Sequence, residues 1–149
     1  MVWKAERVKV DERFDPKDPE RLQHALRLLQ MYILARAVTV FYELVGYSMD
    51  REDAAHTFAE VSISLHGGKI HGAFHLQIHA PPPSEVATYD LETGAFDDHQ
   101  LGQNCPERFV ATIGVAYAAS RCYPERVVAF KMNGKLYEAR NGEIQLKKD

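Results

Sequence analysis

The sequence has few of the residue types that mark a special class of protein. Only two of its 149 residues are cysteines, Cys105 and Cys122. We expect them near opposite ends of one helix, too far apart for a disulfide bond within the chain. Reduced thiols are typical of cytoplasmic proteins, so we expect this protein in the cytoplasm. Basic residues are not in excess either, because 18 Lys and Arg are outnumbered by 21 Asp and Glu, giving a net charge of −3. This balance makes nucleic acid an unlikely partner.

Long apolar runs are also missing. The most apolar stretch, 31–45, contains Arg36, Thr39 and Glu43 and is shorter than the roughly 20 apolar residues that a membrane-spanning helix needs. We therefore expect a buried helix and no membrane partner. The N-terminal residues carry mixed charges in place of the apolar core of a signal peptide. At 46% hydrophobic residues, the chain is rich enough in apolar side chains to form a single α+β domain over residues 1–149.

Start and stop signals predict three helices. The long first helix begins after Asp18 as N-cap, with Pro19 in its first turn, and ends before Gly46. Its second half is apolar around most of its circumference, so it either lies at the centre of the fold or contributes to an oligomer interface. The run 37–42 also suits a strand, although the length of the pattern favours a helix. A short second helix is predicted over about 50–60, and a third over about 105–122.

Glycine turns predict the strands. Gly67-Gly68 forms a two-residue turn that pairs Leu65 with Ile70, so that apolar side chains meet on one face of the hairpin. A second hairpin turns near Gly94, and two Asn-Gly turns divide residues 127–148 into a three-stranded meander. We therefore predict an α+β fold with an antiparallel sheet built from the two hairpins and the meander, packed with the three helices.

Four of the seven histidines lie between positions 66 and 79, on the first hairpin. Side chains alternate across a strand, so the apolar residues of this segment point to one face and His71, His75, Gln77 and His79 point to the other. We predict that this polar face is an interface with another protein. A solvated sheet surface is the plainer interpretation of the same pattern.

Three of these histidines, His66, His71 and His75, are also candidate ligands of a divalent metal ion. Histidines four positions apart on one strand have Cα atoms about 13 Å apart, so an ion would need ligands from both strands of the hairpin. His66 lies diagonal to His71, and a third ligand would have to come from the loop 97–99 or from a second subunit. No cofactor is expected unless such a site is completed.

Cys105 offers a different chemistry. It lies at a predicted helix N-terminus, where the helix dipole favours a thiolate, and His99 with Asp97 or Asp98 precedes it by a short loop. A cysteine, a base and an acid are the elements of nucleophilic catalysis. No recognisable signature surrounds Cys105, however, and a plain helix-start residue is the simpler interpretation.

Residues 42–53 have the helix, glycine turn and helix spacing of a helix-turn-helix, and the histidine hairpin could serve as a wing. The predicted recognition helix opens with Asp50, Glu52 and Asp53, and these acids would meet phosphate oxygens.

We expect a non-catalytic protein of the immunity, antitoxin, chaperone or accessory-subunit type. It would act as a homodimer through a sheet face and an apolar helix. A small hydrolase and a winged-helix DNA-binding protein are the alternatives.

Overall fold

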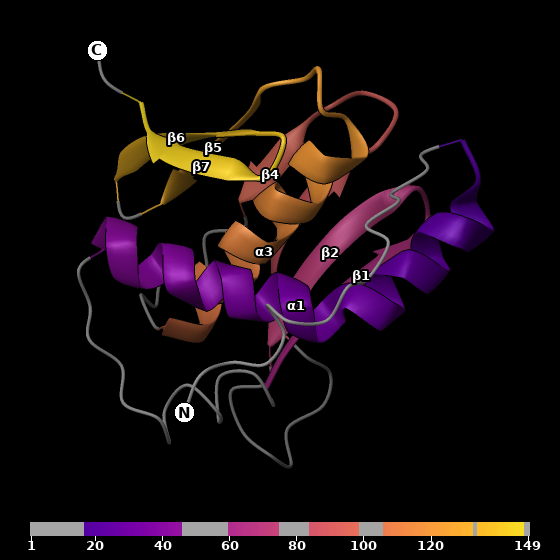
Figure 1. Cartoon of the computed structure of the whole chain (residues 1–149), viewed down its shortest axis with the longest axis horizontal. Coiled ribbons are helices and arrows are strands. Elements are labelled where there is room, and N and C mark those ends of the chain that lie inside the picture. The colour runs from indigo at the N-terminus through magenta and orange to yellow at the C-terminus, as the bar shows by residue number, and fades with distance from the viewer. Residues whose placement is uncertain (1–16, 46–59, 75–83, 99–105, 133, 148–149) are drawn as a thin grey trace.

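The computed structural model describes residues 17–45, 60–74, 84–98, 106–132 and 134–147. Within these residues the chain forms two helices and seven strands, and the strands divide into a four-stranded and a three-stranded antiparallel sheet. Figure 1 shows α1 crossing the front of the molecule with α3 behind it. The predicted α+β class is confirmed. The predicted second helix falls largely on residues 46–59, which lie outside the described part of the chain.

Helix α1, Pro19–Val45, starts where the sequence predicts, because the backbone N–H of Arg21 donates to Asp18 Oδ1 at 3.3 Å. Seven of the 14 residues from 31 to 44 are buried within the single chain, so much of its apolar surface belongs to the core, and the strand alternative for 37–42 is wrong. By length and composition alone, Pro19–Leu44 could cross a bilayer, because an 18-residue stretch within it has a mean hydropathy of 1.2. Core helices of soluble proteins meet the same criterion, and half of this stretch is buried.

The four-stranded sheet consists of β1 Val61–His66, β2 Lys69–Phe74, β3 Ser84–Asp90 and β4 Phe96–Asp98, in that order. The predicted register of the first hairpin is confirmed: Leu65 pairs with Ile70. The turn glycines Gly67 and Gly68 have φ values of 59° and 73°, which favour glycine. Because β2 also pairs with β3, the two predicted hairpins form one sheet. A bulge interrupts that pairing between Gly72 and Ala73.

The three-stranded sheet consists of β5 Val128–Met132, β6 Lys135–Arg140 and β7 Glu143–Leu146. The meander is therefore as predicted, but it forms a sheet of its own, so the prediction of one sheet built from hairpins and meander is wrong. The two sheets meet where the rings of Phe96 on β4 and Phe130 on β5 lie 5.5 Å apart between centroids. Each sheet has an apolar face, and α3 provides an apolar surface for both.

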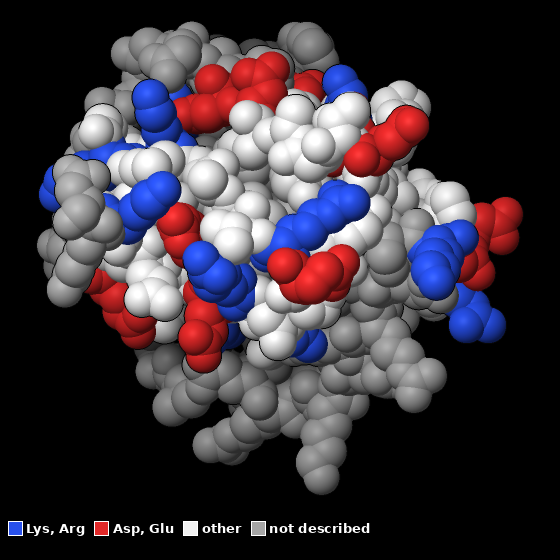
Figure 2. Space-filling model, turned by 90° about the horizontal axis from the view of Figure 1, so that it is seen from above, with Lys and Arg blue, Asp and Glu red and all other residues white. Residues whose placement is uncertain are grey.

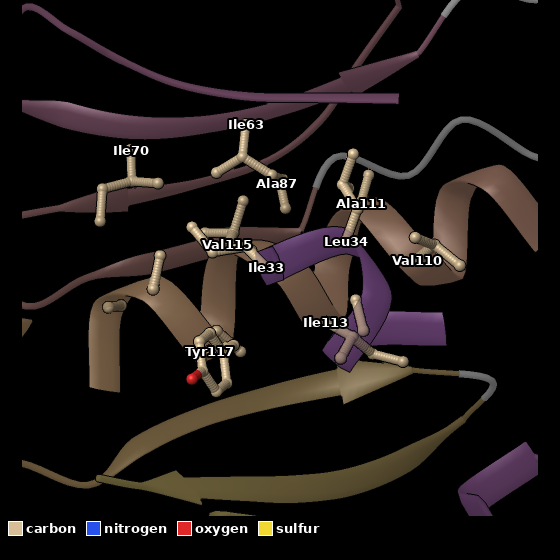
Figure 3. Packing of buried hydrophobic residues seen from close by; sticks show 14 of the residues in the cluster. Ile33, Leu34, Ile63, Ile70, Ala87, Val110, Ala111, Ile113, Val115 and Tyr117 are labelled. Atoms are coloured by element: carbon tan, nitrogen blue, oxygen red, sulfur yellow. The ribbon is translucent and has the colours of Figure 1, made fainter. Parts of the chain in front are cut away.

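Helix α3, Pro106–Cys122, lies between the sheets and also contacts α1 (Figure 3). Fourteen of its 17 residues are buried, so α3 is covered by other parts of the protein on nearly all sides. Small residues allow the sheet and helix to approach closely. A Cβ atom built on Gly72 would lie 2.7 Å from Val115 Cγ2. The packing of α3 and α1 on one face of the four-stranded sheet determines which face remains for function.

Candidate functional site

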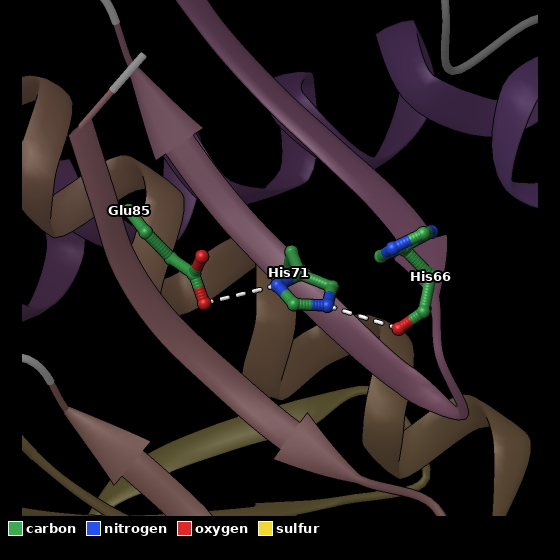
Figure 4. A network of polar contacts seen from close by, with 3 residues as sticks. All are labelled: His66, His71 and Glu85. Atoms are coloured by element: carbon green, nitrogen blue, oxygen red, sulfur yellow. Dashed lines mark hydrogen bonds and ion pairs between the residues drawn. The ribbon is translucent and has the colours of Figure 1, made fainter. Parts of the chain in front are cut away.

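The strand register separates a core face of the four-stranded sheet from an opposite polar face, which we call the outer face. Figure 4 shows this face turned toward the viewer, with the helices behind the strands. The register assigns to it side chains that are nearly all polar: Ser62, Ser64, His66, Lys69, His71, Ala73, Glu85, Thr88, Asp90 and Asp97. Most of them are exposed or half-buried, whereas Thr88 in the middle is buried.

His71 on β2 connects three strands across the outer face (Figure 4). Its Nδ1 lies 2.9 Å from Oε1 of Glu85 on β3, and its Nε2 lies 3.0 Å from the backbone oxygen of His66 on β1. A carbonyl oxygen and a carboxylate oxygen can only accept hydrogen bonds, while a neutral imidazole has one N–H. Only the doubly protonated ring can therefore donate both hydrogen bonds. The two contacts hold the His71 ring in one orientation.

The structure describes two of the four histidines of the segment 66–79. His66 and His71 lie on the same face, with ring centroids 6.1 Å apart, and Ser64 pairs with His71 as predicted. His75, Gln77 and His79 lie outside the described residues, as do His99 and Cys105, so their roles stay predictions.

Sequence reasoning missed Glu85. Alternation along residues 84–90 does not assign Glu85 to the outer face, because a bulge in the β2–β3 pairing adds an extra residue to β3 at this point. Glu85 lies opposite Ala73, while Ala87 lies opposite Gly72, so Val86 is the extra residue. Simple alternation counted from the centre of β3 therefore puts Glu85 on the wrong face.

The predicted metal site has only part of its ligand set in the described residues. Within that part of the chain, no three His, Cys, Asp or Glu side chains are close enough to hold a metal ion. Both ring nitrogens of His71 contact protein oxygen atoms, so one of these contacts would have to be given up for metal binding. The site through His66, His71 and His75 stays a prediction because it depends on His75.

The acids proposed to assist Cys105 lie on opposite faces of β4. Asp98 accepts a hydrogen bond from Arg108 Nη2 at 3.1 Å, and these two side chains are only 15% and 10% exposed. Asp97 pairs with Thr88 and lies on the outer face. Cys122 is buried in the core, and this burial raises the pKa of its thiol to about 12.

Charge is divided across the outer face. The groups that carry or can acquire positive charge, His66, Lys69 and His71, lie on β1 and β2, whereas the carboxylates Glu85, Asp90 and Asp97 lie on β3 and β4. Asp90 accepts hydrogen bonds from the N–H groups of Thr93 and Glu92, and these bonds lower its pKa. Elsewhere the charges are mixed: Figure 2 shows Lys and Arg interspersed with Asp and Glu over the face seen from above.

Comparisons of the chain with protein-family models, with curated proteins and with solved structures find no match.

Proposed function

We propose that this chain is a non-catalytic protein that binds another protein through the outer face of its four-stranded sheet. The observation that carries the proposal is the fixed His71 side chain, held between Glu85 and the His66 carbonyl on a face that α1 and α3 leave uncovered. A side chain ordered before binding loses less conformational entropy when a partner docks. The polar residues of this face would then act as positioned hydrogen-bonding groups rather than as flexible surface residues.

The charge division indicates which partners fit. A partner surface should present acidic groups toward Lys69 on β2 and basic groups toward the carboxylate side of the face, on β3 and β4. Complementary charge of this kind sets orientation and association rate more than it sets affinity. A protein surface, with both signs of charge in reach, matches this requirement, whereas the phosphate backbone of nucleic acid meets only its positive half.

Helix α1 takes part as a core element in this proposal, since its apolar residues pack against α3 and β1. We also keep the cytoplasm as the proposed compartment, in keeping with the free thiol of Cys122.

The proposal can be tested by affinity capture with the immobilised full-length chain and two matched variants. Lys69→Glu reverses a charge on the outer face, and Lys131→Glu makes the same change at an exposed position of β5, in the other sheet. We expect a protein that the wild-type chain and Lys131→Glu retain equally, and that Lys69→Glu retains at least several-fold less. Equal retention by all three forms would overturn the outer face as the binding surface.

A further inference from the structure

We propose that Arg126 anchors an oxyanion-binding site at the end of the four-stranded sheet where β3 turns into β4, and that this site takes a carboxylate or phosphate group of a ligand. Arg126 lies in the short connection between α3 and β5. The site does not depend on the proposed function of the outer face. Its guanidinium group combines a fixed position with an edge that the described residues leave open.

The local sequence places the guanidinium group over an aromatic ring. The backbone N–H of Arg126 donates to the carbonyl oxygen of Tyr123 at 2.9 Å, which closes a four-residue turn with Pro124 at its second position. This turn brings Cζ of Arg126 to 3.8 Å from the centroid of the Tyr123 ring, a cation–π contact. The ring covers one flat side of the guanidinium group, so its edges are left for hydrogen bonds.

Two hydrogen bonds hold the guanidinium group at one corner. Nη1 of Arg126 donates to the hydroxyl oxygen of Tyr89 at 3.4 Å and to the backbone oxygen of Leu91 at 3.3 Å. Tyr89 is buried, so its hydroxyl group has a fixed position. The β3–β4 turn also lies against this corner, because a Cβ atom built on Gly94 would be 3.8 Å from Nη1. The side chain is therefore ordered in advance, which reduces the entropy lost when a ligand binds.

The remaining donors of Arg126 form a fork. A guanidinium group carries five N–H groups, and Nη1 holds two of them. Within the described residues, no protein acceptor contacts the other three, which belong to Nε and Nη2. The N–H of Nε and one N–H of Nη2 point in parallel along one edge, and this geometry matches two oxygen atoms of a carboxylate or phosphate group. Arg126 is only half-buried, so solvent reaches the side chain.

Glu125 opposes the binding of an anion. It adjoins Arg126 in the sequence, and its side chain is exposed. The negative charge of Glu125 repels an incoming anion, although solvent and salt screen an exposed charge. We therefore expect a small anion by itself to bind weakly, and a complete ligand to add contacts of its own.

Anion titrations followed through the Nε–H resonances of the arginines test the proposal. Acetate and inorganic phosphate are the separate probes, at constant ionic strength. Arg27 on α1 is the internal control, because it is exposed and no described residue bonds to its side chain. Arg126 should reach half-saturation at an anion concentration roughly tenfold lower than Arg27 does, because its fork is ordered in advance. Tighter binding of acetate would identify a carboxylate ligand, and tighter binding of phosphate would identify a phosphate ligand.

Four variants separate the fork from simple charge. Tyr123→Phe keeps the ring and should bind as the wild type does, whereas Tyr123→Leu removes it and should bind several-fold more weakly. Glu125→Gln removes the opposing charge and should bind more tightly. Arg126→Lys keeps the charge but lacks the fork, so the backbone amides of Leu91 and Gly94 should lose their response to the anion. Thermal unfolding checks that each variant folds.

Two results would overturn the proposal. One is a response of Arg126 to both anions that is no stronger than the response of Arg27. The other is equal anion binding by Arg126→Lys, which would show that positive charge alone suffices. If Tyr123→Leu does not fold, Arg126→Lys decides the question by itself.

Discussion

A Cβ atom built on Gly72 of β2 would lie 2.8 Å from the backbone oxygen of Ala111 on α3. At this point the backbone of the four-stranded sheet touches the backbone of the central helix, without an intervening side chain. A backbone carbonyl inside a helix cannot move aside without disturbing the helix. The Gly72–Ala111 contact therefore determines how closely the sheet approaches α3.

We predict that Gly72→Ala lowers the free energy of unfolding by roughly 1–3 kcal/mol through overpacking. Gly114→Ala is the comparison, because its added Cβ would meet the side-chain atom Ile63 Cδ1 at 2.8 Å, and alanine also favours a helix by about 1 kcal/mol. Chemical denaturation of both variants should show the larger loss at Gly72. An equal or larger loss at Gly114 would contradict the backbone contact.

Helix α3 also holds the meander of β5, β6 and β7, through Ser120. The N–H of Gly142 in the β6–β7 turn donates to Ser120 Oγ at 2.9 Å, and this hydroxyl donates to the Tyr117 carbonyl oxygen. Ser120→Ala leaves a buried N–H without its acceptor, so we expect a loss of about 1–3 kcal/mol in unfolding free energy. Thr112→Val is the control, since the Thr112 hydroxyl bonds only to a carbonyl of its own helix. Similar losses in both variants would show that Ser120 does not anchor the turn.

Hydrogen bonding predicts the tautomer of His71 once its ring is neutral. The proton should stay on Nδ1, because the hydrogen bond to the Glu85 carboxylate is charge-assisted and the one to the His66 carbonyl is not. In Glu85→Gln the side-chain amide can donate to Nδ1, and the proton should move to Nε2. Nitrogen NMR of the imidazole distinguishes the two forms. An Nε2–H tautomer in the wild-type protein would show that Glu85 does not orient the ring.

Cys122 should behave as a thiol that the folded protein protects. Burial raises its pKa from 9.0 to about 12. Between these two pH values the folded chain therefore keeps the thiol proton, while the unfolded chain loses it. The corresponding stability is fully present below pH 9.0 and is lost as the pH rises toward 12. In a Cys105→Ser background, a thiol reagent at neutral pH should label Cys122 only after unfolding. Rapid labelling of the native chain would contradict the burial of Cys122.

The local elements were predictable because their signals are local. Asp18 and Pro19 mark the start of α1, and Leu65 opposite Ile70 fixes the hairpin register. The central position of α3 was not predictable from side-chain periodicity. Alanine and glycine, such as Ala111 and Gly114, contribute little to a hydrophobic pattern, although they are the residues that allow close packing on every side.

The outer face was predictable only in part. Alternation along β2 correctly assigned His71, but the residue that orients it comes from β3, across a bulge that alternation does not reveal. The division into two sheets was equally hidden. Among the described residues the meander pairs only with itself, and its contact with the other sheet joins Phe130 and Phe96, which lie 34 residues apart in the sequence.

The outer face of the four-stranded sheet is the proposed docking surface, and backbone amide NMR of the chain before and after addition of a protein that it captures examines this surface residue by residue. On addition of that protein, shifts should change at outer-face residues such as Ser64, His71 and Asp97. The competing surface on α1 carries the exposed Leu28 and Met31, which are 63% and 50% exposed. Changes confined to Leu28 and Met31, with an unaffected outer face, would contradict the claim.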